Sequence, residues 1–153
     1  MIENIFVSVV IILICAVFQG VIVSILLNFL IYLDLKNLIR TSALHITFII
    51  SLSLIILVSC NLVQIGLWAS VFRAYGEFED FSTAFYHSTV NFTTLGYGDI
   101  VLSPERRLLG AVEAMNGLLM FGLTTATIFA VLQNLMQRRL LEVTAKNEFS
   151  DQP

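Results

Sequence analysis

Two glycines separated by a tyrosine, Gly96-Tyr97-Gly98, are the residues of this chain best suited to chemistry. They belong to residues 93–99, T-T-L-G-Y-G-D, here called the Gly-Tyr-Gly segment. Glycine adopts positive φ at little steric cost, so the pair allows a backbone whose carbonyl oxygens turn to one axis. A row of such oxygens can replace the hydration shell of a cation. The predicted chemistry is therefore cation coordination by the backbone.

Long apolar stretches surround this segment and must position it. Of 153 residues, 58% are hydrophobic and 12% are charged, which is about half the charged fraction of a soluble domain. Residues 5–33, 44–72 and 108–137 each exceed the length of about 20 residues that crosses a bilayer. The sequence predicts an all-α membrane protein with three transmembrane helices. We expect no nucleic-acid partner, because the chain has no basic patch, and no enzyme activity, because no nucleophile–base set or metal cluster appears.

A short helix is predicted directly before the Gly-Tyr-Gly segment, over residues 81–92. Acidic residues precede it and suit the positive end of a helix dipole, and Asp80 or Ser82 is placed to cap it. At about 12 residues it is too short to span a bilayer, so it is predicted to be a re-entrant half-helix surrounded by protein. Pro104 and the charges after it mark the start of the third span.

With its half-helix and two flanking spans, the Gly-Tyr-Gly segment resembles the selectivity filter of bacterial potassium channels. The resemblance covers about residues 44–137 and implies a pore domain of outer helix, pore helix, filter and inner helix. Residues 1–43 are then an extra transmembrane helix with a cytoplasmic linker, and residues 138–153 a short cytoplasmic tail. One motif per chain cannot surround an ion, so a cyclic homotetramer is implied. Its partners are K⁺ as the permeant ion and the lipid bilayer, with no further cofactor.

The resemblance also assigns roles to residues of the segment and its surroundings. It implies K⁺ coordination along Thr94, Leu95, Gly96, Tyr97 and Gly98. Leu95 stands where the family more often has Val or Ile, and Tyr97 is expected to pack against aromatic residues of the pore helix. The residues expected to support the filter are Tyr86 paired with Asp99, Val90 (where some members carry Glu), Thr93 and Glu113.

The third span resembles the pore-lining helix of the same family. Gly117 has two interpretations, a gating hinge or a site of close helix packing. Leu118, Phe121, Thr125 and Phe129 recur at three- and four-residue steps, so they share one face, which the resemblance implies lines the cavity. Phe129 and Gln133 are the candidates for the inner constriction.

Two titratable residues inside the predicted helices leave alternatives open. Glu113 lies where a carboxylate is costly, and is either a structural hydrogen-bond partner of the pore helix, through Thr89 or Thr93, or a pH- or ion-sensing acid. His87 is either a hydrogen-bonding support or a proton sensor. Cys15 and Cys60 are expected to be buried, unpaired thiols.

Basic residues favour one orientation in a cell membrane. Those expected in the cytoplasm are Lys36, Arg40, Arg138, Arg139 and Lys146. The N-terminus would then lie outside and the C-terminus inside. Three functions compete: a K⁺-selective channel, a weakly selective cation channel, and a non-conducting accessory or receptor subunit with a channel-like fold.

Overall fold

A computed structural model describes residues 2–36 and 42–150, without the side chains of 142 and 145–150. The described residues form four helices and no strand: α1 (Ile2–Leu35), α2 (Ala43–Ala74), α3 (Phe81–Phe92) and α4 (Arg107–Ser150). The helices α1, α2 and residues Arg107–Leu141 of α4 are long and apolar enough to cross a membrane. The predicted all-α membrane fold is confirmed. Arg40 and the side chain of Lys146, used above to orient the chain, lie outside the described residues.

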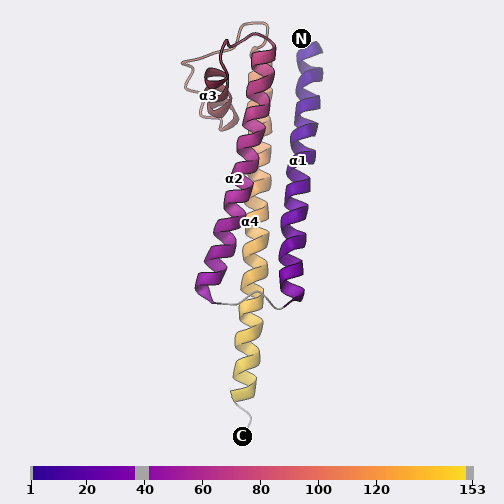
Figure 1. Ribbon diagram of the computed structural model, residues 1–153, viewed down its shortest axis with the longest axis vertical. Coiled ribbons are helices and arrows are strands. Elements are labelled where there is room, and N and C mark those ends of the chain that lie inside the picture. The colour runs from indigo at the N-terminus through magenta and orange to yellow at the C-terminus, as the bar shows by residue number, and fades with distance from the viewer. Residues whose placement is uncertain (1, 37–41, 151–153) are drawn as a thin grey trace.

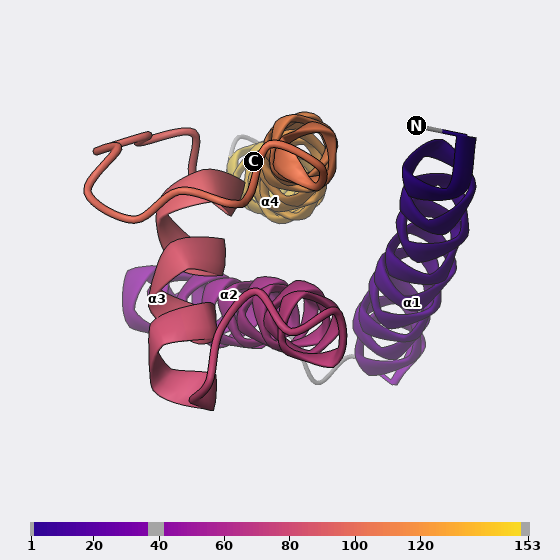
Figure 2. The same cartoon turned by 90° about the horizontal axis from the view of Figure 1, so that it is seen from above.

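The three long helices lie side by side, and the short α3 packs at one end of them (Figure 1). Seen from above, α1 and α3 lie on opposite sides of the pair formed by α2 and α4 (Figure 2). The helix α3 contacts α2 and α4, whereas α1 and α3 are not in contact in the described part of the chain. The N-terminus lies at the α3 end, and α4 runs on past the other helices to the C-terminus (Figure 1). The helix that precedes the predicted pore domain therefore covers the side away from the Gly-Tyr-Gly segment.

The start of α3 is set by Asp80, one of the two predicted caps. Its carboxylate accepts hydrogen bonds from the Thr83 amide at 2.8 Å and the Thr83 hydroxyl at 2.7 Å. These bonds stabilise the charged form and hold the pKa of Asp80 below its ordinary value. Ser82, the alternative cap, lies inside the helix. The cap fixes where α3 begins.

At its N-terminal end, α1 is held to the loop before α4. The Asn4 amide donates to the Glu105 carbonyl at 2.6 Å, and the Arg106 guanidinium donates to the Asn4 side-chain oxygen at 2.6 Å. Arg106 also pairs with Glu3 at 3.2 Å and lies 3.9 Å over the Tyr75 ring. One arginine therefore joins the N-terminus of α1 to the ends of α2 and α4.

Halfway along, α1 joins the other long helices through a buried polar cluster centred on Gln19. The Gln19 oxygen accepts from Gln64 of α2 at 2.7 Å, and the Gln19 amide donates to the Thr124 hydroxyl of α4 at 3.2 Å. The Cys60 thiol donates to the same Gln19 oxygen at 2.9 Å. Both Cys60 and Cys15 are buried and free, as predicted.

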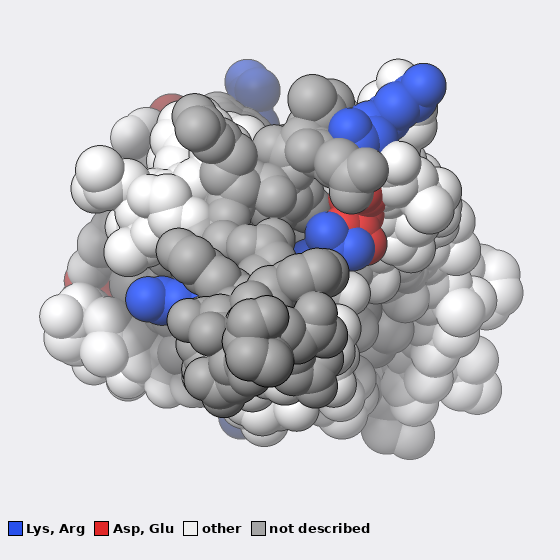
Figure 3. Space-filling model, turned by 90° about the horizontal axis from the view of Figure 1, so that it is seen from below, with Lys and Arg blue, Asp and Glu red and all other residues white. Residues whose placement is uncertain are grey.

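At the opposite end, Asp34 of α1 forms an ion pair with Arg138 of α4. Above this pair Ile49, Val131 and Leu135 form a buried apolar cluster. Seen from below, the described basic side chains (blue) lie apart from one another, and most of the other described surface is uncharged (Figure 3). The three long helices are thus joined near both ends and in the middle.

Candidate functional site

The backbone of the Gly-Tyr-Gly segment alternates between two conformations. Thr94, Gly96 and Gly98 have positive φ, at 59°, 59° and 74°. Leu95 and Tyr97, which lie between them, are not among the residues with positive φ. When φ alternates between negative and positive values, successive peptide groups point in the same direction. The same alternation occurs in backbone nests, where successive N–H groups converge on an anion. Positive φ at every second residue of the Gly-Tyr-Gly segment is what the predicted row of carbonyl oxygens on one side requires.

Hydrogen bonds occupy the amides in the first half of the segment, whereas the carbonyl oxygens of residues 94–98 accept none from the described residues. Three consecutive amides donate to carbonyl oxygens at the end of α3, with these pairs: Thr94 to Asn91 at 2.8 Å, Leu95 to Val90 at 2.9 Å, and Gly96 to Val90 at 3.3 Å. In residues 2–36 and 42–150, no hydrogen bond is donated to a carbonyl oxygen of residues 94–98. Residues 93–99 are also exposed over their whole length. Unpaired, accessible carbonyl oxygens are what a dehydrated cation needs.

Two adjacent α3 side chains hold the chain just after the glycines. The Tyr86 hydroxyl donates to the Asp99 carboxylate at 2.7 Å, so the structure brings together the pair that the resemblance implied. This bond lowers the pKa of Asp99 and raises the pKa of Tyr86, because it stabilises the carboxylate and the neutral phenol. The next α3 residue, His87, bonds through Nδ1 to the Ile100 carbonyl at 3.1 Å.

His87 is buried among aromatic rings. Only 6% of it is exposed, and its ring centroid lies 5.4 Å from that of Phe72 and 5.1 Å from that of Phe78. Burial lowers the pKa of His87, since the charged imidazolium loses hydration there. Because the Ile100 carbonyl can only accept, Nδ1 carries the proton of the neutral ring. Of its two predicted roles, the structure provides the hydrogen-bonding one.

Glu113 lies against α3, as predicted, but with partners that the sequence analysis missed. The Ser88 hydroxyl bonds one carboxyl oxygen, and the Asn91 amide donates to the other at 3.2 Å. The prediction of Thr89 or Thr93 as the partner was wrong. Both hydroxyls bond back to their own helix, to the Phe85 and Thr89 carbonyls at 2.7 Å.

Two glycines of α4 allow its close approach to α3 on either side of Glu113. A Cβ at Gly117 would lie 1.9 Å from the Phe92 carbonyl oxygen, and one at Gly110 would lie 2.7 Å from the Asn91 amide nitrogen. Backbone atoms cannot yield to such a contact, so Gly117 is required for close packing, one of its two predicted roles. The role of hinge stays a prediction.

The four residues predicted to share a cavity-lining face differ in their exposure in the single chain. Leu118, Thr125 and Phe129 are exposed, as is Gln133. Phe121 instead packs edge-on against Phe92 at the end of α3, with centroids 5.7 Å apart. Phe121 is half-buried, and its place on the cavity-lining face stays a prediction.

The remaining predicted supports differ in how they contact the segment. Val90 is buried and contributes its carbonyl oxygen to two amides of the segment. Tyr97 is 67% exposed, and no ring of the described residues pairs with it. Its expected packing against pore-helix aromatics is therefore not made within one chain.

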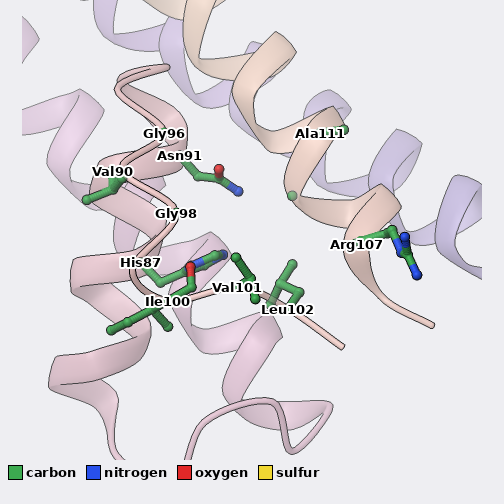
Figure 4. Close-up of a pocket in the computed structure, with 11 residues that line it drawn as sticks. His87, Val90, Asn91, Gly96, Gly98, Ile100, Val101, Leu102, Arg107 and Ala111 are labelled. Carbon is green, nitrogen blue, oxygen red and sulfur yellow. The ribbon is translucent and has the colours of Figure 1, made fainter. Parts of the chain in front are cut away.

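A cavity of about 200 Å³ lies behind the Gly-Tyr-Gly segment. It is lined by Gly96 and Gly98 of the segment, by His87 and Asn91 of α3, and by the start of α4 at Gly110. Figure 4 shows the segment passing in front of α3 while α4 stands across the gap. The segment is thus hydrogen-bonded to α3, and the cavity separates it from the start of α4.

Sequence reasoning missed Ser88, Asn91 and Gly110, although one signal was available. Gly110, Glu113 and Gly117 lie three and four residues apart, so they share one face of α4. Small residues beside a carboxylate mark a close helix contact, which needs polar partners on the facing helix. Ser88 and Asn91, three residues apart on α3, fit that need.

The family model described as "Ion channel" matches residues 44–134, more than half of the chain. No curated protein and no solved structure gives a significant match. The matched region contains α2, α3, the Gly-Tyr-Gly segment and α4 as far as residue 134, and leaves α1 outside. On the match and on the architecture described above, the chain belongs to the ion channel family.

Proposed function

We propose that this protein is a potassium-selective channel that conducts K⁺ passively through a homotetrameric pore. The observation that carries the proposal is the state of the Gly-Tyr-Gly backbone. The amides of Thr94, Leu95 and Gly96 are bonded to the end of α3, the carbonyl oxygens of residues 94–98 have no donor among the described residues, and φ is positive at every second residue from 94 to 98. K⁺ would bind along Thr94, Leu95, Gly96, Tyr97 and Gly98, where carbonyl oxygens replace its hydration shell.

A tetramer is part of the proposal because one chain exposes this segment on one side only. Four copies around a fourfold axis would enclose an ion path and cover Tyr97. The exposed α4 residues Leu118, Thr125 and Phe129 would then line the cavity below the filter. The helix α1, on the far side of α2 and α4 from α3 (Figure 2), would face outward in such an assembly.

The proposed orientation puts the N-terminus outside the cell membrane and the C-terminus in the cytoplasm. In support, the N-terminus lies at the same end of the molecule as the loops on either side of α3 (Figure 1). Those loops carry Glu77, Glu79, Asp80, Asp99 and Glu105. Acidic residues at a pore mouth raise the local concentration of cations.

Flux from liposomes containing the purified protein tests the proposal. We expect K⁺ efflux that Ba²⁺ blocks and little Na⁺ flux. Gly98→Ala should abolish K⁺ flux, because alanine at φ 74° is strained in the conducting backbone. Gly76→Ala is the matched control, since Gly76 has the same φ of 74° in the loop before α3 and also has open space around it.

Three outcomes would contradict the proposal in different ways. Equal K⁺ and Na⁺ flux would indicate a weakly selective cation channel. A folded protein without any flux would favour an accessory or receptor subunit. Equal loss of flux in Gly98→Ala and Gly76→Ala would show that the Gly98 effect is general strain and not the loss of ion coordination.

A further inference from the structure

Glu113 is a carboxyl group in the protein interior that has no cationic partner in the described part of the chain. It has no exposed surface. The ion pairs of the described residues, Arg106 with Glu3 and Arg138 with Asp34, do not include it. An ionised carboxylate in such a place costs several kcal/mol unless it is paired. The charge state of Glu113 therefore has to be deduced from its hydrogen bonds.

Counting hydrogens around Ser88 decides between the two charge states. The Ser88 oxygen lies within hydrogen-bond distance of a Glu113 oxygen, Oε1, and of the Ile65 carbonyl oxygen, the latter at 3.0 Å. A hydroxyl has one hydrogen. If Glu113 were ionised, both neighbours would be acceptors and one contact would lack a hydrogen.

A neutral Glu113 satisfies both contacts. Its own O–H donates to the Ser88 oxygen, and the Ser88 O–H donates to the Ile65 carbonyl. The second oxygen of Glu113, Oε2, then accepts from the Asn91 amide at 3.2 Å. Each hydrogen in this arrangement has one acceptor, and the chain of bonds runs from α4 through α3 to α2.

No neighbouring helix offers a charge that would favour the ionised form. From α3 the facing side chains are the uncharged Ser88 and Asn91, while His87 points to the Ile100 carbonyl. From α2 the contact is the Ile65 carbonyl, reached through Ser88. From α1 the titratable group near Glu113 is the buried, free thiol of Cys15.

We propose that Glu113 is a neutral carboxylic acid that positions α3 through Ser88, and that the filter conducts while Glu113 keeps its proton. Val90, two residues after Ser88, holds the Leu95 and Gly96 amides through its carbonyl oxygen. When Glu113 loses its proton, the O–H that donated to the Ser88 oxygen becomes an oxygen that can only accept. The contact with Ser88 then changes, and α3 and the segment shift. The charge state of Glu113 stands on the hydrogen-bond count, and only its control of conduction rests on the proposed channel function.

Infrared difference spectroscopy on the full-length protein tests the charge state without any need for conduction. The spectrum of wild type minus Glu113→Gln at neutral pH should contain the carbonyl stretching band of a protonated carboxylic acid. Glu105→Gln, which removes an exposed acid at the outer surface, is the matched control and should leave that band intact. A carboxylate band in its place, or no band from Glu113 at all, would overturn the proposal.

Flux against pH tests the control of conduction. Wild-type K⁺ flux should fall by about tenfold for each pH unit above the point at which Glu113 ionises. Glu113→Gln, uncharged at every pH and still able to donate to Ser88, should conduct without this fall. A wild type with the acid band but with flux independent of pH would refute the control of conduction. If the acid band is present and no variant conducts at any pH, the proposed channel function fails and the charge state stands.

Discussion

Gly117 shows at the scale of one residue how a missing side chain positions two helices. Its Cα hydrogen allows α4 to approach the carbonyl end of α3 to a distance that a methyl group would prevent. A glycine inside a helix costs about 1 kcal/mol relative to alanine. The α4 helix tolerates that cost here because the close contact places Glu113 against Ser88 and Asn91.

We predict that Gly117→Ala destabilises the protein by about 1–3 kcal/mol through overpacking, despite the higher helix propensity of alanine. Gly122→Ala, in the same helix with nothing within 4 Å of the added Cβ, should be neutral or stabilising. Thermal unfolding of both variants in detergent measures the difference. If Gly117→Ala left the thermal stability unchanged and altered only the opening of the channel, Gly117 would act as a hinge and not as a packing site.

His87 gives the stability of the protein a predictable dependence on pH. Its pKa in the folded protein is lowered by burial, whereas the unfolded chain has the ordinary value of about 6.5. The stability that the neutral ring contributes is therefore complete above pH 6.5. It is lost as the pH falls below 6.5 towards the lowered pKa of the folded state, because the unfolded chain binds the proton more readily.

We predict that the melting temperature of the wild type falls between pH 7 and pH 5, at a cost of up to about 1.4 kcal/mol per pH unit. His87→Gln, which lacks the titrating ring, should have a flatter profile over this range. Circular dichroism melts at several pH values make the comparison. Parallel profiles for the two proteins would show that His87 does not titrate on unfolding.

Among the secondary-structure elements, α1 is attached to the other long helices by polar contacts at three points along its length. The contact at the N-terminal end of α1 centres on Arg106, the middle one on Gln19 and the one at its C-terminal end on Asp34. Lipid chains are as apolar as leucine, so apolar contact alone does little to select a partner helix in a membrane. The polar contacts therefore give α1 a defined place against α2 and α4.

We predict that Gln19→Leu destabilises the protein by about 1–2 kcal/mol, because interhelical hydrogen bonds in membranes average about 0.6 kcal/mol and Gln19 joins both α2 and α4. Val17→Leu, at a 66% exposed position of α1, is the matched control and should be silent. Thermal melts in detergent measure both. A loss no greater than that of the control would mean that the polar cluster does not hold α1.

At the scale of the whole molecule, the single chain leaves its most specialised segment uncovered. Two largely uncharged surfaces are exposed in the single chain: residues 93–99, and the α4 residues Leu118, Thr125 and Phe129. In the proposed tetramer both surfaces face the shared axis. Bound K⁺ would then hold the four segments together, since carbonyl oxygens facing one another repel without a cation.

We predict that removal of K⁺ lowers the thermal stability of the tetramer. With K⁺ at 100 times its dissociation constant, the gain over a K⁺-free buffer is about 2.7 kcal/mol. Native mass spectrometry during heating, in K⁺ and in choline, measures the tetramer fraction. Gly98→Ala should lose this dependence and Gly76→Ala should keep it. A protein that is monomeric in both salts would contradict the prediction.

The sequence by itself determined the helices and the Gly-Tyr-Gly segment, because both depend on local chemistry. Apolar runs longer than a bilayer crossing become helices in lipid whatever their neighbours, and the predicted spans agree with α1, α2 and α4 to within a few residues at most ends. The cap at Asp80 and the positive φ of Gly96 and Gly98 are likewise properties of short stretches of chain.

Tertiary structure alone decided which polar side chains meet. The sequence placed Glu113 against the pore helix but not against Ser88 and Asn91, because that choice depends on the rotation of α4 about its axis. The same rotation turns Phe121 towards Phe92 and makes Gly117 a point of contact. Helix rotation is set by side-chain packing between residues far apart in the chain. The spacing of Gly110, Glu113 and Gly117 indicates a contact face on α4, but it does not say which residues of α3 meet that face.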